Sequence, residues 1–114
     1  MINIITSSRY IINRPLIKKV VIDFISKNHL INQTINIIFI GKNKMKALAK
    51  QYKNENTVLP VLTFKYKEKT NEENLLGEIF ICYSQMILLA AERNKKVEDV
   101  MVKLLNHGLE NLLL

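Results

Sequence analysis

The pattern of apolar and polar positions changes its period several times along the chain. Some segments are short and apolar or alternating, as in β-strands, and others place apolar residues at the three- and four-residue spacing of an amphipathic helix. The predicted elements are strand, helix, strand, helix, strand, strand, helix and helix, at residues 2–6, 14–28, 35–40, 43–52, 62–67, 76–82, 85–92 and from 97 onward. No repeat or low-complexity linker separates them. We therefore predict a single α+β domain over residues 1–114, of order βαβαββαα, with a mixed four-stranded sheet packed by helices.

Several segments carry signals for where they begin and what they bury. Pro15 suits the first turn of the first helix, where no backbone N–H is needed. Asn43 and Ser84 are the expected N-caps of the second and third helices. Residues 35–40 are apolar on both faces, which predicts a central strand covered on both sides. The face of the second helix that is expected to point inward consists of Met45, Leu48, Ala49 and Tyr52.

The third and fourth predicted strands follow one another closely. Pro60 marks the start or the edge of the strand at residues 62–67, because proline cannot donate to a central ladder. Residues 70–74 are charged and turn-like, which indicates a hairpin loop. We therefore expect this strand and the strand at residues 76–82 to be antiparallel neighbours.

The last helix combines a broad apolar stripe with a His-Gly pair. At about 100° per residue, His107 and Asn111 share a face at the edge of that stripe. Two histidines at this spacing can ligate zinc, but zinc needs three or four protein ligands and Asn is a poor one; the alternative is a boundary histidine bonded to a backbone carbonyl. Gly108 costs a helix about 1 kcal/mol relative to Ala, so it predicts close approach of a ligand or of a strand. The stripe comprises Val100, Met101, Leu104, Leu105, Leu109, Leu112 and Leu113.

Four other positions carry residues that are typical of functional sites or of close packing. Gly77 within a strand indicates a bulge or a close approach, and Glu78 beside it either offers a carboxylate to a cleft or faces water. Cys82 is expected to be a small buried hydrophobe, because no histidine is placed to activate it. His29 is expected to complement the end of the first helix. The sequence has no glycine-rich phosphate loop, paired cysteine motif or serine elbow, which sets aside the enzymes built on them.

The charge of the chain suits a polyanionic partner. The formal net charge is +7, from fourteen Lys and three Arg against ten acids, and basic side chains that neutralise phosphates release counterions. A biased genome rich in Lys, Asn and Ile would produce the same charge without such a partner. No apolar run approaches the roughly 18 residues of a membrane span. Residues 1–8 lack a secretory pattern and the single cysteine has no partner, so we expect a cytoplasmic protein with no membrane role.

Three motifs point to one family. Residues 76–82, Leu-Gly-Glu-Ile-Phe-Ile-Cys, are similar to a Leu-Gly-Asp-Ile segment, and residues 104–109, Leu-Leu-Asn-His-Gly-Leu, to the start of a His-Gly-x-x-His-x-x-x-x-x-His motif. Residues 61–64, Val-Leu-Thr-Phe, look like a Val-Leu-Ser-Phe strand, at a spacing that places Lys53 where the family carries Arg. The chain thereby resembles, over most of its length, the YbeY family of ribosomal RNA maturation factors, described as metal-dependent, single-strand-specific endoribonucleases. The resemblance implies that family's fold, a zinc ion held by histidines, and ribosomal RNA or the small ribosomal subunit as partner.

The chain also departs from the family pattern. Of the three family histidines it has the first, His107; Asn111 stands at the second position, and the third would lie beyond residue 114. Leu59 and Pro60 replace the family's Thr-Asp. Because one histidine cannot hold a catalytic zinc ion, the metal chemistry that the resemblance implies is expected to be degraded here.

These observations lead to one main expectation and two alternatives. We expect a ribosome biogenesis factor that binds RNA through Lys53, Lys65 and Lys67, with Lys53 at the family's catalytic arginine position and His107 as the retained metal ligand. Lys53 lacks the planar fork with which Arg grips phosphate, so any endoribonuclease activity is expected to be weak. The first alternative is a small protein-interaction module with incidental basic charge. The second is an active metallonuclease whose missing ligands come from a partner or a second copy; the oligomeric state stays open.

Overall fold

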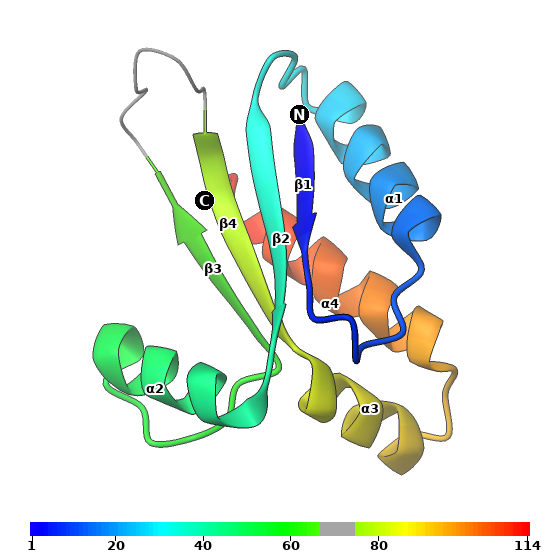
Figure 1. Cartoon of the computed structure of the whole chain (residues 1–114). Helices are drawn as coiled ribbons and strands as arrows, with labels where there is room; N and C mark the ends of the chain where they lie inside the picture. Colours follow the sequence, from blue (N-terminus) through cyan, green and yellow to red (C-terminus); the bar gives the residue numbers. More distant parts are fainter. Residues whose placement is uncertain (67–74) are drawn as a thin grey trace.

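The computed structural model describes residues 1–66 and 75–114 of the chain. Within these residues the elements follow one another as sequence reasoning predicts (Figure 1). Their bounds are β1 Ile2–Ile5, α1 Arg14–Lys27, β2 Thr34–Ile40, α2 Lys42–Lys53, β3 Val61–Lys65, β4 Leu75–Cys82, α3 Tyr83–Glu92 and α4 Val97–Asn111. The predicted α+β order βαβαββαα is therefore confirmed. The hairpin loop expected at residues 70–74 lies outside the described residues.

The four strands form a mixed sheet in the order β1-β2-β4-β3. β1 and β4 both run parallel to β2, and β3 runs antiparallel to β4, as expected for the hairpin pair. In the register of the central pair, Ile37 of β2 lies opposite Ile79 of β4. β2 is the predicted strand with two covered faces, since its residues alternate between the two core clusters described below.

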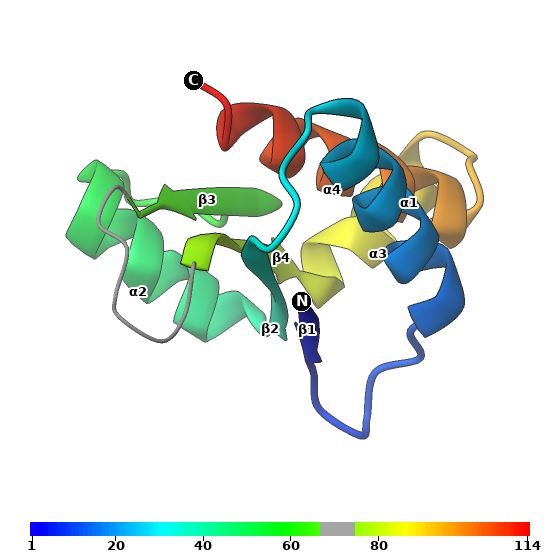
Figure 2. The same ribbon diagram turned by 90° about the horizontal axis from the view of Figure 1, so that it is seen from above.

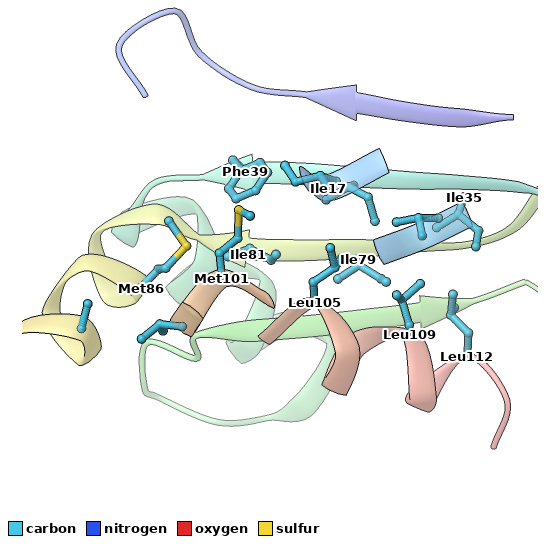
Figure 3. Close-up of a cluster of buried hydrophobic side chains, with 14 residues drawn as sticks. Ile17, Ile35, Phe39, Ile79, Ile81, Met86, Met101, Leu105, Leu109 and Leu112 are labelled. Atoms are coloured by element: carbon cyan, nitrogen blue, oxygen red, sulfur yellow. The ribbon is translucent and has the colours of Figure 1, made fainter. Parts of the chain in front are cut away.

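One face of the sheet is covered by α1 and α4, with α3 at one end (Figure 2). The buried side chains on this side come from the strands and all three helices, and in Figure 3 Leu105 and Leu109 of α4 point toward Ile79 of β4. The burial of these side chains is the main stabilising contribution to the fold, at about 1.5–3 kcal/mol for each fully buried aliphatic side chain. The cluster consists of Ile17, Val21, Ile35, Ile37, Phe39, Ile79, Ile81, Met86, Ala90, Val100, Met101, Leu105, Leu109 and Leu112.

The opposite face of the sheet is covered by α2 and carries a smaller cluster. Its buried members are Ile38, Ile40, Met45, Leu62 and Cys82. Figure 2 shows α2 on the side of the sheet away from α1 and α4. The sheet is thus covered unequally on its two faces.

Beyond this cluster the same face carries a row of hydrogen bonds across the strands. The Asn3 amide donates to Asn36 Oδ1 at 2.9 Å, and the Asn36 amide donates to Glu78 Oε2 at 3.2 Å. The Tyr66 hydroxyl donates to Glu78 Oε1 at 2.5 Å. Glu78 therefore does not offer a free carboxylate to a cleft, and it is part of the polar surface of the sheet.

Two expected helix caps are wrong. The N-caps of α2 and α3 are Gly41 and Cys82, neither of which makes a side-chain cap bond, so Asn43 and Ser84 lie inside their helices. In both cases a strand runs almost directly into the helix, so the single junction residue, Gly41 or Cys82, occupies the N-cap position. The expected opening of α1 is confirmed, because Pro15 occupies its first turn.

Three residues expected on buried faces are less covered than predicted. Tyr52 of α2 is 57% exposed and contacts Phe64 edge-on, with ring centroids 4.9 Å apart. Leu104 is partly buried, and Leu113 is 48% exposed because it follows the end of α4. The other predicted inward residues of α2 and α4 are buried or partly buried. No helix among the described residues is both long and apolar enough to cross a membrane.

Candidate functional site

The close packing of α4 on the sheet is centred on Gly108. A Cβ atom at this position would lie 2.7 Å from Ile79 Cγ2, well inside van der Waals contact. The Thr63 hydroxyl of β3 donates to the Gly108 carbonyl at 3.2 Å. The sequence predicted that either a ligand or a strand approaches Gly108 closely, and the structure shows that a strand does. This contact draws the exposed side of α4, with His107, up to the edge strand β3.

A pocket of about 400 Å³ lies where the end of α2, strand β3 and α4 meet. Its lining includes two lysines, one histidine, one glutamate, one asparagine and one threonine, with apolar side chains beneath them. The lining residues are Lys53, Glu55, Leu59, Val61, Leu62, Thr63, Lys65, His107, Asn111 and Leu114.

Three elements bring the predicted site residues together in this pocket. Lys53 is the last residue of α2, Lys65 is the last residue of β3, and His107 and Asn111 project from α4. The expectation that His107 and Asn111 share a face is confirmed. The Lys65 ammonium donates to the Leu114 carbonyl, which ties β3 to the segment after α4. Lys67, the third expected RNA-binding lysine, lies outside the described residues.

The sequence reasoning missed Glu55 and Thr63 as members of the pocket. Asn54 ends α2 in a left-handed conformation, with φ 53°, and the Glu55 N–H donates to the Ala49 carbonyl at 3.2 Å. This reversal is the usual way to end a helix, and it places Glu55 at the pocket. The signal in the sequence was the Asn-Glu pair directly after the helix, which is compatible with a left-handed cap. Among the described residues of the lining, Glu55 is the single acidic residue beside two lysines.

The donors in the pocket do not fit a three-ligand zinc centre. His107 and Glu55 are the lining residues of the kind that zinc commonly takes in proteins, and Asn111 offers a weakly basic amide oxygen. Across residues 1–66 and 75–114, no three His, Cys, Asp or Glu side chains lie close enough to hold a metal ion. The described residues of the pocket therefore do not provide the ligands that a catalytic zinc ion needs.

The other residues weighed for chemistry lie apart from the pocket. Glu78 raises the pKa of Tyr66 to about 12, chiefly through the hydrogen bond between them and further through burial and the repulsion of charges. Cys82 is fully buried, as expected, with its sulfur 3.5 Å from the Ser84 hydroxyl. His29 lies just after α1 with a positive φ of 56°, in a turn closed by a bond from its N–H to the Ser26 carbonyl.

Gly77 also has a structural explanation. A Cβ atom there would lie 2.5 Å from the Phe64 carbonyl oxygen of the neighbouring strand and would clash with the Leu112 side chain. The predicted close approach is thus confirmed, and its partners are β3 and the segment after α4. Both glycines of the family-like motifs serve the packing of α4 on the β3–β4 hairpin.

Comparison with known proteins gives a consistent result. A family model described as Endoribonuclease YbeY matches residues 6–113. The protein named Endoribonuclease YbeY from Thermodesulfovibrio yellowstonii is 38% identical over 80 residues, which cover 69% of this chain and 50% of that protein. The protein of the same name from Finegoldia magna is 30% identical over 83 residues, covering 72% and 54%. The chain thus matches about half the length of these curated relatives.

A solved structure supports the fold. The solution structure of TM1509 from Thermotoga maritima matches with a TM-score of 0.66 at 23% sequence identity. The match covers 98% of this chain and 71% of that one. At this identity the similarity establishes the shared architecture of sheet and helices.

Proposed function

The chain belongs to the YbeY endoribonuclease family, and from this premise we propose that it acts in ribosomal RNA maturation by binding single-stranded RNA in the pocket between α2, β3 and α4. The observation that carries the proposal is the convergence of Lys53, Lys65 and His107 in one pocket, from the neighbouring elements α2 and β3 and from the distant α4. The partner is ribosomal RNA or the small ribosomal subunit, and the compartment is the cytoplasm.

The pocket supplies the groups that contact a phosphate backbone. The ammonium groups of Lys53 and Lys65 are compact positive charges that neutralise phosphates and release their counterions. Thr63 and Asn111 add neutral hydrogen-bonding groups beside them. The volume of about 400 Å³ is in the range of small-ligand sites and suits one nucleotide of a flexible single strand.

Hydrolysis by the zinc-dependent route that the resemblance implies is not part of the proposal. That route needs a metal ion that activates water or polarises the phosphoryl group, and the described residues do not fit its ligand set. Lys53, at the family's arginine position, neutralises the phosphate that enters the pocket, and His107 lines the same pocket from α4. We therefore propose RNA binding with little or no zinc-stimulated cleavage by this chain.

The test uses a labelled single-stranded RNA that carries a small-subunit ribosomal RNA 3′ end, with and without zinc. We expect the wild-type chain to bind the RNA and Lys53→Gln and Lys65→Gln each to weaken binding several-fold, since each removes one phosphate contact. Lys103→Gln, on the exposed side of α4 and outside the pocket lining, is the matched control and should leave binding nearly unchanged.

Three results would change this account. Failure of the wild-type chain to bind RNA would refute the proposed function. Zinc-stimulated cleavage that is lost in His107→Ala would show that a working metal site exists, and the proposal of lost chemistry would then be wrong. Co-purification with a protein partner and no RNA affinity would favour the alternative of a protein-interaction module.

A further inference from the structure

The basic charge of the chain is concentrated on one helix. α2 carries five lysines and no acidic residue within 12 residues, so it contributes +5 to a formal net charge of +7. All five lysines are exposed. They are Lys42, Lys44, Lys46, Lys50 and Lys53.

Four of these lysines form a line along the helix. At about 100° and 1.5 Å per residue, the successive spacings of four, four and three residues keep Lys42, Lys46, Lys50 and Lys53 within an arc of about 80° over a length of about 16 Å. We call these four residues the lysine stripe. Lys44 lies on the other side of the helix, across the buried face, and is a natural internal control.

Helix stability does not account for the stripe. Like charges four residues apart destabilise a helix, and lysines in the first turn are placed unfavourably for the helix dipole. α2 has no acidic residue in its first turn and no side-chain N-cap to offset this cost. In α4, by contrast, Glu98 and Asp99 stand in the first turn, where they stabilise the helix. The dipole favours Lys50 and Lys53 in the last turn, so the cost to local stability falls on Lys42 in the first turn and on the like-charge pairs within the lysine stripe.

The stripe leads into the pocket. Lys53 is both the last member of the stripe and a residue of the pocket lining, and Lys65 of β3 continues the positive charge on the far side. Figure 1 shows the chain after α2 leading into β3, and the lysines that end these two elements, Lys53 and Lys65, line the same pocket. Because single strands are held in positively charged grooves that follow their backbone, this arrangement forms a path toward the site.

We propose that the lysine stripe is a binding track for the phosphate backbone of single-stranded RNA, which guides the strand along α2 into the pocket at Lys53. This proposal rests on the proposed function and adds to it the surface outside the pocket that the RNA follows. A duplex does not fit, because its paired strands cannot enter a pocket of about 400 Å³. A lipid surface is disfavoured, because a helix bound to a membrane inserts an apolar face, whereas Met45 and Ala49 of α2 are fully buried and Tyr52 is the one largely exposed member of that face.

The test measures the affinity of the full chain for a single-stranded oligoribonucleotide as a function of salt. The stripe variant combines Lys42→Gln, Lys46→Gln and Lys50→Gln and keeps Lys53, so the pocket lining stays intact. The charge-matched control combines Lys18→Gln, Lys19→Gln and Lys103→Gln, three exposed lysines outside α2. Gln is a good helix former, so circular dichroism should confirm that both variants fold.

The stripe variant is expected to bind roughly 10- to 100-fold more weakly near 0.1 M salt, with a salt slope reduced by about 2, since each phosphate contact to a single strand contributes about 0.7 to the slope. The control should change affinity by no more than about threefold, the long-range effect of net charge, and should keep its slope. Within α2, Lys46→Gln alone should weaken binding more than Lys44→Gln does.

The outcomes separate this proposal from the proposed function. If the wild type binds RNA and Lys53→Gln weakens it, but the stripe variant and the control bind equally, the track is refuted and the pocket stands. If the wild type does not bind RNA, both fail. Binding to vesicles with anionic lipid that depends on the same lysines and exceeds RNA binding would refute the track in favour of a membrane surface.

Discussion

The two helices that border the pocket, α4 and α2, are built in opposite ways. α4 buries Val100, Met101, Leu105, Gly108 and Leu109 against the sheet and begins with two acidic residues that suit its dipole. α2 buries only Met45 and Ala49 and carries five lysines without one acid. The pocket therefore lies between a tightly packed helix, α4, which positions His107, and a highly charged helix, α2. The sequence of α2 favours anion binding over helix stability.

The same division runs through the whole sheet. Among the described residues, fourteen buried side chains form the cluster on the side of α1, α3 and α4, and five form the cluster on the side of α2. We therefore expect substitutions in α4 to act mainly on folding and substitutions in α2 to act mainly on binding.

The largest effect is expected from truncation of the α4 core. Leu105 is fully buried, so Leu105→Ala should lower the free energy of unfolding by about 2–5 kcal/mol in a urea titration, through lost burial and the cavity that remains. Leu48→Ala, at a partly buried position of α2, should cost less than half as much. Equal losses would contradict the unequal roles of the two helices.

Next in size is the contact between Gly108 and the sheet. A Cβ atom at Gly108 would crowd Ile79, so Gly108→Ala should lower the free energy of unfolding by about 1–3 kcal/mol despite the gain in helix propensity. Gly41→Ala is the control, because its Cβ would lie 3.4 Å from the nearest atom, the Tyr10 hydroxyl, with an ordinary φ of −84°. It should cost less than Gly108→Ala, because at this N-cap position only the weaker capping preference of Ala opposes the change. A stabilised Gly108→Ala protein would argue that the helix is less tightly packed than described.

A smaller effect of opposite sign is expected on α2. Lys46→Glu replaces two like-charge pairs, with Lys42 and Lys50, by opposite-charge pairs at the same spacing. At about 0.2–0.5 kcal/mol per pair, thermal or urea unfolding should show a gain of about 0.5–1 kcal/mol while affinity for single-stranded RNA falls. Loss of both stability and affinity would indicate that Lys46 has a structural role instead.

The smallest effect concerns the hydrogen bond between Tyr66 and Glu78 on the polar surface of the sheet. Tyr66 ionises at an ordinary pKa of 10.0 in an unfolded chain, but its bond to Glu78 raises the pKa to about 12 in the folded state. Below pH 10 both states keep the phenol proton and the bond contributes fully. Between pH 10 and 12 the unfolded state loses this proton while the folded state keeps it, so stability falls as the pH rises through this window.

Tyrosinate absorbance checks this expectation directly. The difference between wild type and Tyr66→Phe should titrate near pH 12, and in Glu78→Gln the Tyr66 transition should move down toward pH 10. Because Tyr66 is 41% exposed, we expect only a minor effect on overall stability. An unshifted transition in Glu78→Gln would show that Glu78 is not the cause.

Sequence reasoning predicted the fold well because the apolar periodicity reports burial directly. The stripe of α4 and the two-faced apolar pattern of β2 left few alternatives for the layers. The predictions of the two N-caps were wrong because the strand-to-helix junctions at Gly41 and Cys82 depend on chain geometry that local residue preferences do not show. The prediction that Tyr52 points inward was wrong because its ring packs edge-on against Phe64 while much of the side chain remains exposed.

The site was predictable in part, and for a specific reason. The motif resemblance placed Lys53 and His107 in one site although they lie far apart in the sequence, and both residues line one pocket with Lys65. Glu55 and Thr63 were missed because their positions depend on the left-handed turn at Asn54 and on the contact between β3 and α4. Such contacts arise only once the elements have packed.

The most direct test of the account is to map a short single-stranded RNA onto the isotope-labelled chain by backbone amide chemical shifts. We predict shifts at Lys53 and Glu55, along β3, at His107 and Asn111, and along the lysine stripe of α2, with little change in α1 and α3. Shifts confined to α1 and α3, or no shift at RNA concentrations that saturate other RNA-binding proteins, would contradict the claim that this pocket binds RNA.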